Sequence, residues 1–216
     1  EMIKLTPVVD PNGSDSARLD NTLEFLLMSG MPLPLPMMIT IPEPWENNEG
    51  MSREKRDFYQ YYATMMEPWD GPASILFTDG DIMGAVLDRN GLRPSRYYIT
   101  DDDQLILSSE VGVLDFDTTH IVKKGRLHPG KMLLVDTVKG ELIDDDILKA
   151  SYVKKQPYGE WLSDNLVFLK DLKIPNVAVE EYSYEESNRL MKAFGYSYEE
   201  VKDSVLPMAL NGSEAI

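Results

Sequence analysis

The segment Ser14-Asp15-Ser16 combines residue types that cap helices with a carboxylate that can bind a cation. A serine or aspartate just before a run of helically spaced apolar residues is a favoured N-cap, so one interpretation is structural. The other is that Asp15 presents its carboxylate to a cationic group of a ligand, in a short charge-assisted hydrogen bond. The two interpretations are compatible, because a cap residue can fix a neighbouring carboxylate.

The run Asp88–Pro94 contains an acid, two arginines and an Asn-Gly pair, and it therefore resembles a catalytic cluster. Turn chemistry gives a simpler account, in which a strand ends at Asp88 and Gly91 adopts a positive φ. Pro94 then restarts an extended segment. The sequence favours this structural interpretation over a catalytic one.

Other kinds of site are not expected. His120 and His128 are the two histidines and fall on separate elements, which disfavours a zinc site. Asp79-Gly80-Asp81 lacks the calcium-loop pattern and predicts a turn. The chain has no cysteine, so it contains no thiol nucleophile and no ligand for an iron–sulfur cluster. We therefore expect no metal site and no catalytic residue within these 216 residues.

The chain is strongly acidic, with a formal net charge of -16. Such a surface repels phosphate backbones and anionic membranes, so neither nucleic acid nor membrane is an expected partner. No apolar run approaches the roughly 20 residues of a membrane span. We expect a cytoplasmic protein, and both ends of the sequence are expected to be cut points in a larger chain.

The helices and strands that must position these residues can be predicted from the spacing of apolar residues, which changes between helical and strand-like periodicity along the chain. Helical spacing predicts one helix from Ser14 or Ser16 to Gly30 and another from Ser52 to Pro68. A proline-dense passage, 31–43, separates them. Strand-like runs are Met2–Leu5, Ala73–Phe77, Ile82–Leu87, Arg96–Thr100, Gln104–Ser108, His120–Lys124, Lys131–Asp136 and Val138–Ile143. Helices packed on short strands predict an α+β layered fold.

The pattern becomes helical after about Asp144. Helices are predicted over Asp145–Val153, Pro157–Lys170, Ser183–Phe194 and Ser197–Met208, and the last two begin with capping-box spacing. We place a domain boundary near 145–156, with one domain over 1–150 and a helical connector leading into a further domain over 151–216. Apolar stripes on residues 157–216 predict a segment that self-associates or exchanges its amide hydrogens rapidly.

Many blocks of this sequence resemble the amidotransferase domain of the glutamate synthases in residue type, order and spacing. The most distinctive block is Leu87–Pro94. The others include Ser14–Asn21, Ile41–Trp45, Glu67–Ala73, Lys124–Leu127, Pro129–Met132, Pro157–Leu162, Phe194–Tyr196 and Pro207–Ala209. Together they extend over nearly the whole chain.

The resemblance implies a class-II, N-terminal-nucleophile amidotransferase, of which this chain is the later part of the αββα sandwich followed by a mostly helical connector. In that class an N-terminal cysteine attacks the side-chain amide of glutamine, an Asn-Gly pair forms the oxyanion hole, and an arginine holds the substrate carboxylate. The aspartate of the Ser-Asp-Ser segment binds the α-amino group, and this role falls on Asp15. The cysteine, the Asn-Gly pair and the arginine would precede Glu1, so the isolated chain should be inactive.

For the parent protein the resemblance implies glutamine hydrolysis to glutamate and ammonia, followed by reductive amination of 2-oxoglutarate. FMN and an iron–sulfur cluster would belong to later domains, and a small reductase subunit is a further possible partner. The sequence does not indicate the reductant. The rival hypothesis is a non-catalytic amino-acid-binding module on an amidotransferase-like scaffold. Other class-II amidotransferases are disfavoured by the helical segment after residue 150.

Overall fold

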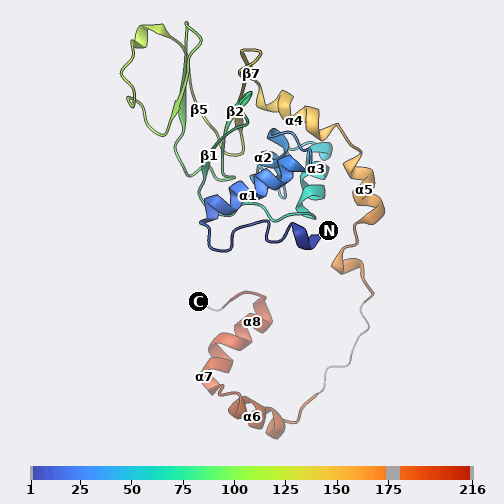
Figure 1. Ribbon diagram of the computed structural model, residues 1–216. Helices are drawn as coiled ribbons and strands as arrows, with labels where there is room; N and C mark the ends of the chain where they lie inside the picture. The colour runs from blue at the N-terminus through green and yellow to red at the C-terminus, as the bar shows by residue number, and fades with distance from the viewer. Residues whose placement is uncertain (1, 174–180, 215–216) are drawn as a thin grey trace. The chain divides into compact units, whose positions relative to one another are not determined.

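The computed structural model describes residues 2–173 and 181–214, and the chain forms two compact units, residues 1–166 and 167–216 (Figure 1). The first unit holds both sheets and the helices that pack on them. Its mixture of helices and antiparallel sheets confirms the predicted α+β class. The predicted domain boundary near residue 150 stays a prediction.

Two antiparallel sheets organise the first unit. The strands are β1 (Ser74–Thr78), β2 (Ile82–Leu87), β3 (Arg96–Thr100), β4 (Leu105–Ser108), β5 (Ile121–Arg126), β6 (Met132–Asp136) and β7 (Glu141–Ile143). Sheet A has the order β1-β2-β6-β7, and sheet B has the order β4-β3-β5. The predicted hairpin turn at Asp79-Gly80 joins β1 to β2, and Gly80 has a φ of +102° as such a turn requires.

A bent two-stranded ribbon connects the two sheets. Strand β2 pairs with β6 in sheet A, and their continuations β3 and β5 pair in sheet B. The Leu127 N–H donates to the Ser95 carbonyl at 2.9 Å, so the pairing continues close to the bend. The bend itself falls between residues 88 and 95 on one strand and 127 and 131 on the other.

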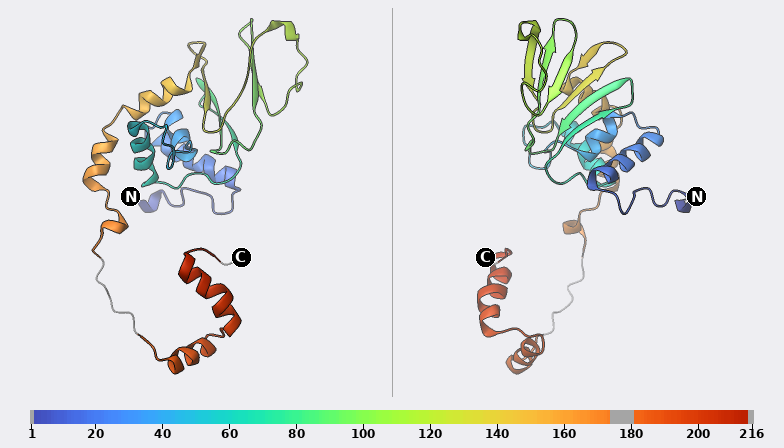
Figure 2. Two further views of the ribbon diagram at one scale, coloured as in Figure 1. Left: turned by 180° about the vertical axis from the view of Figure 1, so that it is seen from behind. Right: turned by 60° about the vertical axis from the view of Figure 1, so that its left-hand side comes forward.

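Helices cover one face of sheet A. The helices of the first unit are α1 (Asp15–Met28), α2 (Pro34–Thr40), α3 (Arg53–Ala63), α4 (Asp145–Val153) and α5 (Tyr158–Asn165), and short 3₁₀ turns lie at Met2–Lys4 and Thr118–His120. A further 3₁₀ turn, Leu169–Asp171, belongs to the second unit. Figure 2 shows the blue and teal helices α1–α3 gathered on one side of the strands. This is the helix-on-sheet layering that an amphipathic helix and a one-sided apolar strand produce.

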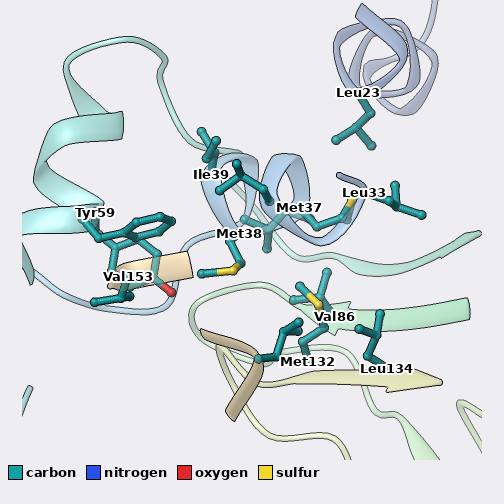
Figure 3. Packing of buried hydrophobic residues seen from close by; sticks show 14 of the residues in the cluster. Leu23, Leu33, Met37, Met38, Ile39, Tyr59, Val86, Met132, Leu134 and Val153 are labelled. Atoms are coloured by element: carbon teal, nitrogen blue, oxygen red, sulfur yellow. The ribbon is translucent and has the colours of Figure 1, made fainter. Parts of the chain in front are cut away.

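The core lies between α2 and strands β2 and β6. Met37 and Met38 of α2 are 0% and 1% exposed, and in Figure 3 they lie close to Val86, Met132 and Leu134 of the sheet. Helix α1 adds Leu23 to this cluster, and α3 and α4 add further apolar side chains. Burying one such side chain stabilises the fold by about 1.5–3 kcal/mol, so α2 anchors the helical layer.

The second unit is helical. It contains α6 (Tyr184–Ala193) and a continuous run of α7 (Tyr198–Glu200), a π-helical turn (Val201–Val205) and α8 (Leu206–Asn211). The π turn ends just before Pro207, which lacks the N–H that an α-helical bond would need at that position. Helices α6 and α8 have no buried residue within the described ranges.

One predicted strand is wrong, one helix was not predicted, and the helix predicted over Pro157–Lys170 ends at Asn165. Met2–Leu5 is not a strand; Met2–Lys4 forms a 3₁₀ turn, and Ile3 remains 89% exposed, because an isolated strand has no edge to pair with. The proline-dense passage contains helix α2, which the sequence analysis did not assign. Pro34 and Pro36 fall in its first turn, where a missing N–H costs no helical hydrogen bond.

Candidate functional site

Asp15 is the first residue of helix α1. Ser14 is the N-cap, and its Oγ accepts a hydrogen bond from the Ala17 N–H at 3.3 Å, which confirms the capping interpretation. The Asp15 side chain is exposed, and within the described ranges it forms no hydrogen bond or ion pair. The structure thus presents an unpaired carboxyl group here, which an ammonium group could contact.

A groove lies next to α1 and extends past strand β1 over the face of sheet A that is opposite to the main core. Its volume is about 970 Å³, and its floor is formed by β1, β2 and β6. Leu76 and Met83, on this face, are 66% and 54% exposed, although strand β2 is apolar along its whole length. A strand with apolar residues on both faces is typical of a sheet covered on both sides.

The rim of the groove is acidic. Helix α1 contributes Ser16, Asp20 and Glu24, which recur every four residues and so share one face, and the β3–β4 turn contributes Asp103. None of the residues lining the groove within the described chain is basic. Asp15 is not among the lining residues, so the structure places the predicted binding residue beside the groove and not inside it.

The sequence analysis did not identify this groove. The signal that could have found it is the coincidence of an acidic stripe on α1 with a strand that is apolar on both faces. Neither pattern alone distinguishes a groove from an ordinary solvated helix and a buried strand.

The Asp88–Pro94 run is a structural turn, as expected. Asp88 is 3% exposed, and its carboxylate accepts hydrogen bonds from the N–H groups of Asn90, Gly91 and Ala73 at 2.9, 3.0 and 3.1 Å. Burial by itself would raise the pKa of Asp88, but these backbone hydrogen bonds, beginning with that from Ala73, hold the pKa below its ordinary value. Asp88 therefore ties the turn to the start of β1.

Gly91 allows the two sides of the bend to approach closely, and Gly130 allows the loop after α2 to approach the bend. Gly91 has a φ of +62°, and a Cβ there would lie 2.5 Å from Pro129 Cγ. A Cβ on Gly130 would lie 2.5 Å from Glu43 Cβ. The exposed arginines of the run lie outside these contacts; Arg89 pairs with Asp70 at 3.2 Å on the surface.

A buried ionic cluster holds the bend to the helical layer. Lys149 of α4 is 3% exposed, and its Nζ lies 2.5 Å from the Gly130 carbonyl oxygen, 2.9 Å from Asp145 Oδ1 and 3.1 Å from Glu43 Oε1. Asp145 Oδ1 also accepts from the Met132 N–H at 2.8 Å. The cluster thus connects α4, strand β6 and the loop after α2.

Further groups complete this cluster. Lys55 Nζ and the Tyr59 hydroxyl contact Glu43 Oε1 at 2.7 and 2.8 Å, and burial followed by the charge of Glu43 raises the Tyr59 pKa. Lys131 Nζ lies 2.7 Å from Asp146 Oδ1, and this hydrogen bond lowers the pKa of Asp146. The opposite charges are matched, so the cluster is a structural clamp and offers no free nucleophile.

The remaining sequence predictions concern metals and membranes. His120 ends the 3₁₀ turn before β5 and contacts Asp101 at 2.8 Å, and His128 lies in the β5–β6 connection, so the two histidines are on separate elements. Among the described residues no group of histidine, aspartate or glutamate side chains is arranged to hold a metal ion. No helix in the described ranges has both the length and the apolar character needed to cross a membrane.

Comparison with known proteins identifies the family to which this chain belongs. The model of the class-II glutamine amidotransferases matches residues 1–161. The chain is 44% identical over 216 residues to the NADPH glutamate synthase large chain of Bacillus subtilis, covering 100% of this chain and 14% of the relative. It is 44% identical to the NADH glutamate synthase of Saccharomyces cerevisiae, covering 100% of this chain and 10% of that protein.

A plant relative is similar to the same extent. The chain is 43% identical to the chloroplastic ferredoxin-dependent glutamate synthase 2 of Arabidopsis thaliana, covering 97% of this chain and 13% of the relative. The chain therefore spans only between 10% and 14% of the length of these relatives. The family model, in contrast, covers most of the chain, so this chain belongs to the class-II glutamine amidotransferases.

Proposed function

We propose that this chain is part of the large subunit of a glutamate synthase. In that protein the amidotransferase domain hydrolyses glutamine to glutamate and ammonia, and the ammonia serves the reductive amination of 2-oxoglutarate. The proposal rests on similarity along the whole chain, at 42–44% identity, to relatives named for NADPH, NADH and ferredoxin. Because all three kinds are equally similar, the reductant stays open.

Within this function we assign Asp15 the binding of the α-ammonium group of glutamine. The supporting observation is that Asp15 is exposed at the start of α1 and has no partner for its carboxylate among the described residues. An ammonium–carboxylate contact would orient the substrate so that its side-chain amide meets the nucleophile.

The remaining chemistry belongs to other parts of the longer protein. The chain has no cysteine, so the nucleophile of class-II chemistry and the ligands of an iron–sulfur cluster cannot come from it. FMN, the cluster and any small reductase subunit are proposed for the parent, and a cytoplasmic location stays a prediction. Residues 1–150 would end the amidotransferase domain, and 151–216 would lead into the next domain.

The test is Asp15→Asn in the full-length protein, assayed with glutamine and, separately, with ammonia. The substitution keeps the shape but removes the charge, and hydrogen bonds to charged groups contribute about 1.5–3 kcal/mol. We expect kcat/KM for glutamine to fall about tenfold or more, while ammonia-dependent synthesis is unchanged.

Asp20→Asn is the matched comparison, because it makes the same change five residues further along α1, at the rim of the groove. We expect little effect. Equal loss of both activities in Asp15→Asn would assign Asp15 a purely structural role. A glutamine-specific loss in Asp20→Asn alone would move the ammonium site to the groove.

The isolated chain should not hydrolyse glutamine, since it has no thiol. Steady glutamate release by the purified chain, insensitive to a glutamine analogue that traps cysteine, would refute the assignment. A cysteine at the processed N-terminus of the proposed parent protein would separate the enzyme from the non-catalytic module, since only the enzyme needs one.

A further inference from the structure

The loop that leads into helix α1 has no regular secondary structure of its own. Its backbone is closed by the Gly13 N–H, which donates to the Asp10 carbonyl at 3.1 Å, and by the Asn12 N–H, which donates to Asp10 Oδ1 at 2.9 Å. Asp10, Asn12 and Ser14 are exposed. A short exposed turn of this kind is expected to move freely unless other groups hold it.

Two side chains of α1 reach back and hold this loop. Asn21 Oδ1 accepts a hydrogen bond from the Asp10 N–H at 3.1 Å, and Arg18 Nη2 donates to the Pro11 carbonyl at 2.7 Å. Residues three apart share one face of a helix, and helical side chains lean toward the N-terminus, so both can reach the same loop. An asparagine inside a helix is otherwise unfavourable, and this contact gives it a structural reason.

The Arg18 contact has a second consequence, for the charge of Asp15. Arg18 follows Asp15 by three residues, a spacing at which an aspartate and an arginine on a helix commonly pair. Its guanidinium is instead directed to the Pro11 carbonyl, and no ion pair joins Arg18 to Asp15 in the described structure. The loop contact therefore keeps a neighbouring cation away from the carboxylate.

We propose that Asn21 and Arg18 are positioning residues for glutamine. By fixing the 10–14 loop they set where α1 begins, and hence the direction of the Asp15 carboxylate, while Arg18 leaves that carboxylate unpaired for a substrate ammonium. This inference rests on the proposed role of Asp15. Binding groups of this kind must be held within about 0.5 Å of the productive geometry, so a loosened loop weakens binding before it affects folding.

The test uses Asn21→Leu and Asn21→Asp in the full-length protein. Leucine removes the acceptor, whereas aspartate keeps an oxygen in the position of Oδ1. We expect Asn21→Leu to raise KM for glutamine about three- to tenfold, with kcat and ammonia-dependent synthesis unchanged. Asn21→Asp should restore most of the loss. Asn165→Leu is the control, since the Asn165 side chain bonds to the Trp161 carbonyl within its own helix.

A double substitution separates this inference from the proposed function. If Asn21 acts through Asp15, adding Asn21→Leu to Asp15→Asn should not raise KM for glutamine further. The inference is overturned if the two effects add, if Asn21→Leu lowers the ammonia-dependent rate equally, or if it changes nothing while Asp15→Asn is impaired. An Asp15→Asn protein with normal glutamine use would instead refute the glutamine-binding role proposed for Asp15, and this inference with it.

Discussion

Helix α6 begins with a complete capping box, whereas helix α2 begins at Leu33 without any side-chain cap. In α6 the Ser183 N–H donates to Glu186 Oε2 at 3.0 Å and the Glu186 N–H donates to Ser183 Oγ at 3.3 Å. Yet α6 contains no buried residue, while every residue of α2 is buried. Local hydrogen bonds therefore define helix α6, whereas tertiary packing defines helix α2.

The same contrast separates the two units. The first unit has a large core in which helices pack on sheet A. In the second unit Phe194 is 77% exposed and Leu206 is 49% exposed, so its apolar stripes are open to solvent. Local sequence signals can therefore be complete in a segment that has little tertiary stabilisation. Substitutions should have large effects where packing dominates and small ones where capping dominates.

The largest effect is expected from Met37→Ala in α2. Met37 is 0% exposed, and truncating such a side chain removes apolar contacts and leaves a cavity. We expect the free energy of unfolding of the first unit to fall by about 2–5 kcal/mol, measured by urea titration. Met65→Ala, at a site that is 61% exposed, is the control and should change it by less than about 0.5 kcal/mol. Equal effects would show that α2 is not the anchor of the core.

Lys149→Met tests whether charges add to that packing. Methionine keeps the apolar volume but leaves Glu43 and Asp145 without their shared buried cation. We expect the free energy of unfolding to fall by about 2–4 kcal/mol. This is less than for most broken buried ion pairs, because Lys55 and Lys131 still contact the two carboxylates. Lys139→Met removes a lysine whose side chain is 65% exposed, and should have little effect. If the stability of Lys149→Met were unchanged, the charges of the cluster would contribute nothing beyond the packing of their side chains.

Asp88→Asn should have an intermediate effect that depends on pH. At neutral pH we expect a loss of about 1–3 kcal/mol, because the amide cannot accept from Asn90, Gly91 and Ala73 as the carboxylate does. The folded-state pKa of Asp88 is lowered, so its stabilisation is present above the unfolded pKa of about 3.9 and is lost as the pH falls through the folded value.

Urea titrations at pH 7 and at progressively more acid pH measure this dependence. The difference between Asp88→Asn and the parent should shrink on acidification. Asp70→Asn is the control, because the Asp70 side chain is 90% exposed and bonds to Arg89 at the surface. A constant difference across the pH range would mean that the Asp88 charge does not stabilise the turn.

The smallest and most local effect is expected from Ser183→Ala. Loss of an N-cap costs about 0.5–2 kcal/mol of helix stability, and here no buried contact adds to it. Amide hydrogen exchange should become faster in α6 while β2 and β6 are unaffected. Ser187→Ala, inside the same helix, should leave the exchange of α6 unchanged or slower. Light scattering checks whether the exposed apolar stripes of the second unit associate between chains. A strictly monomeric chain in which α6 is as protected from exchange as β2 would contradict the proposed difference in tertiary stabilisation between the two units.

Periodicity and turn chemistry were sufficient to predict those elements in which a local sequence pattern coincided with burial. Helices α1 and α3 and the β1–β2 hairpin follow from leucine and aromatic spacing and from Asp79-Gly80. The turn at Asp88 was also predicted from Gly91 and Pro94. These features depend on interactions between residues that are close in the sequence.

Features that depend on distant residues could not be predicted in this way. Helix α2 owes its burial to strands β2 and β6, which lie far along the chain. The ionic cluster of Lys149 with Glu43 likewise joins residues that no spacing rule relates. For the site, Asp15 was selected by its motif, and its role stays a prediction. The groove beside it was not predicted, because it exists only where α1 and sheet A meet.

The bent ribbon has a consequence for the order in which the chain folds. Strand β3 pairs with β4 across a tight turn, with Asp103 at a φ of +62°, so this hairpin can form early. Adding β5 to β3 then brings β2 and β6 together at the far end of the same ribbon. Closing sheet A after sheet B requires a much shorter loop than pairing β2 with β6 directly. Sheet B would thus act as a folding template for sheet A, on which the helical core assembles.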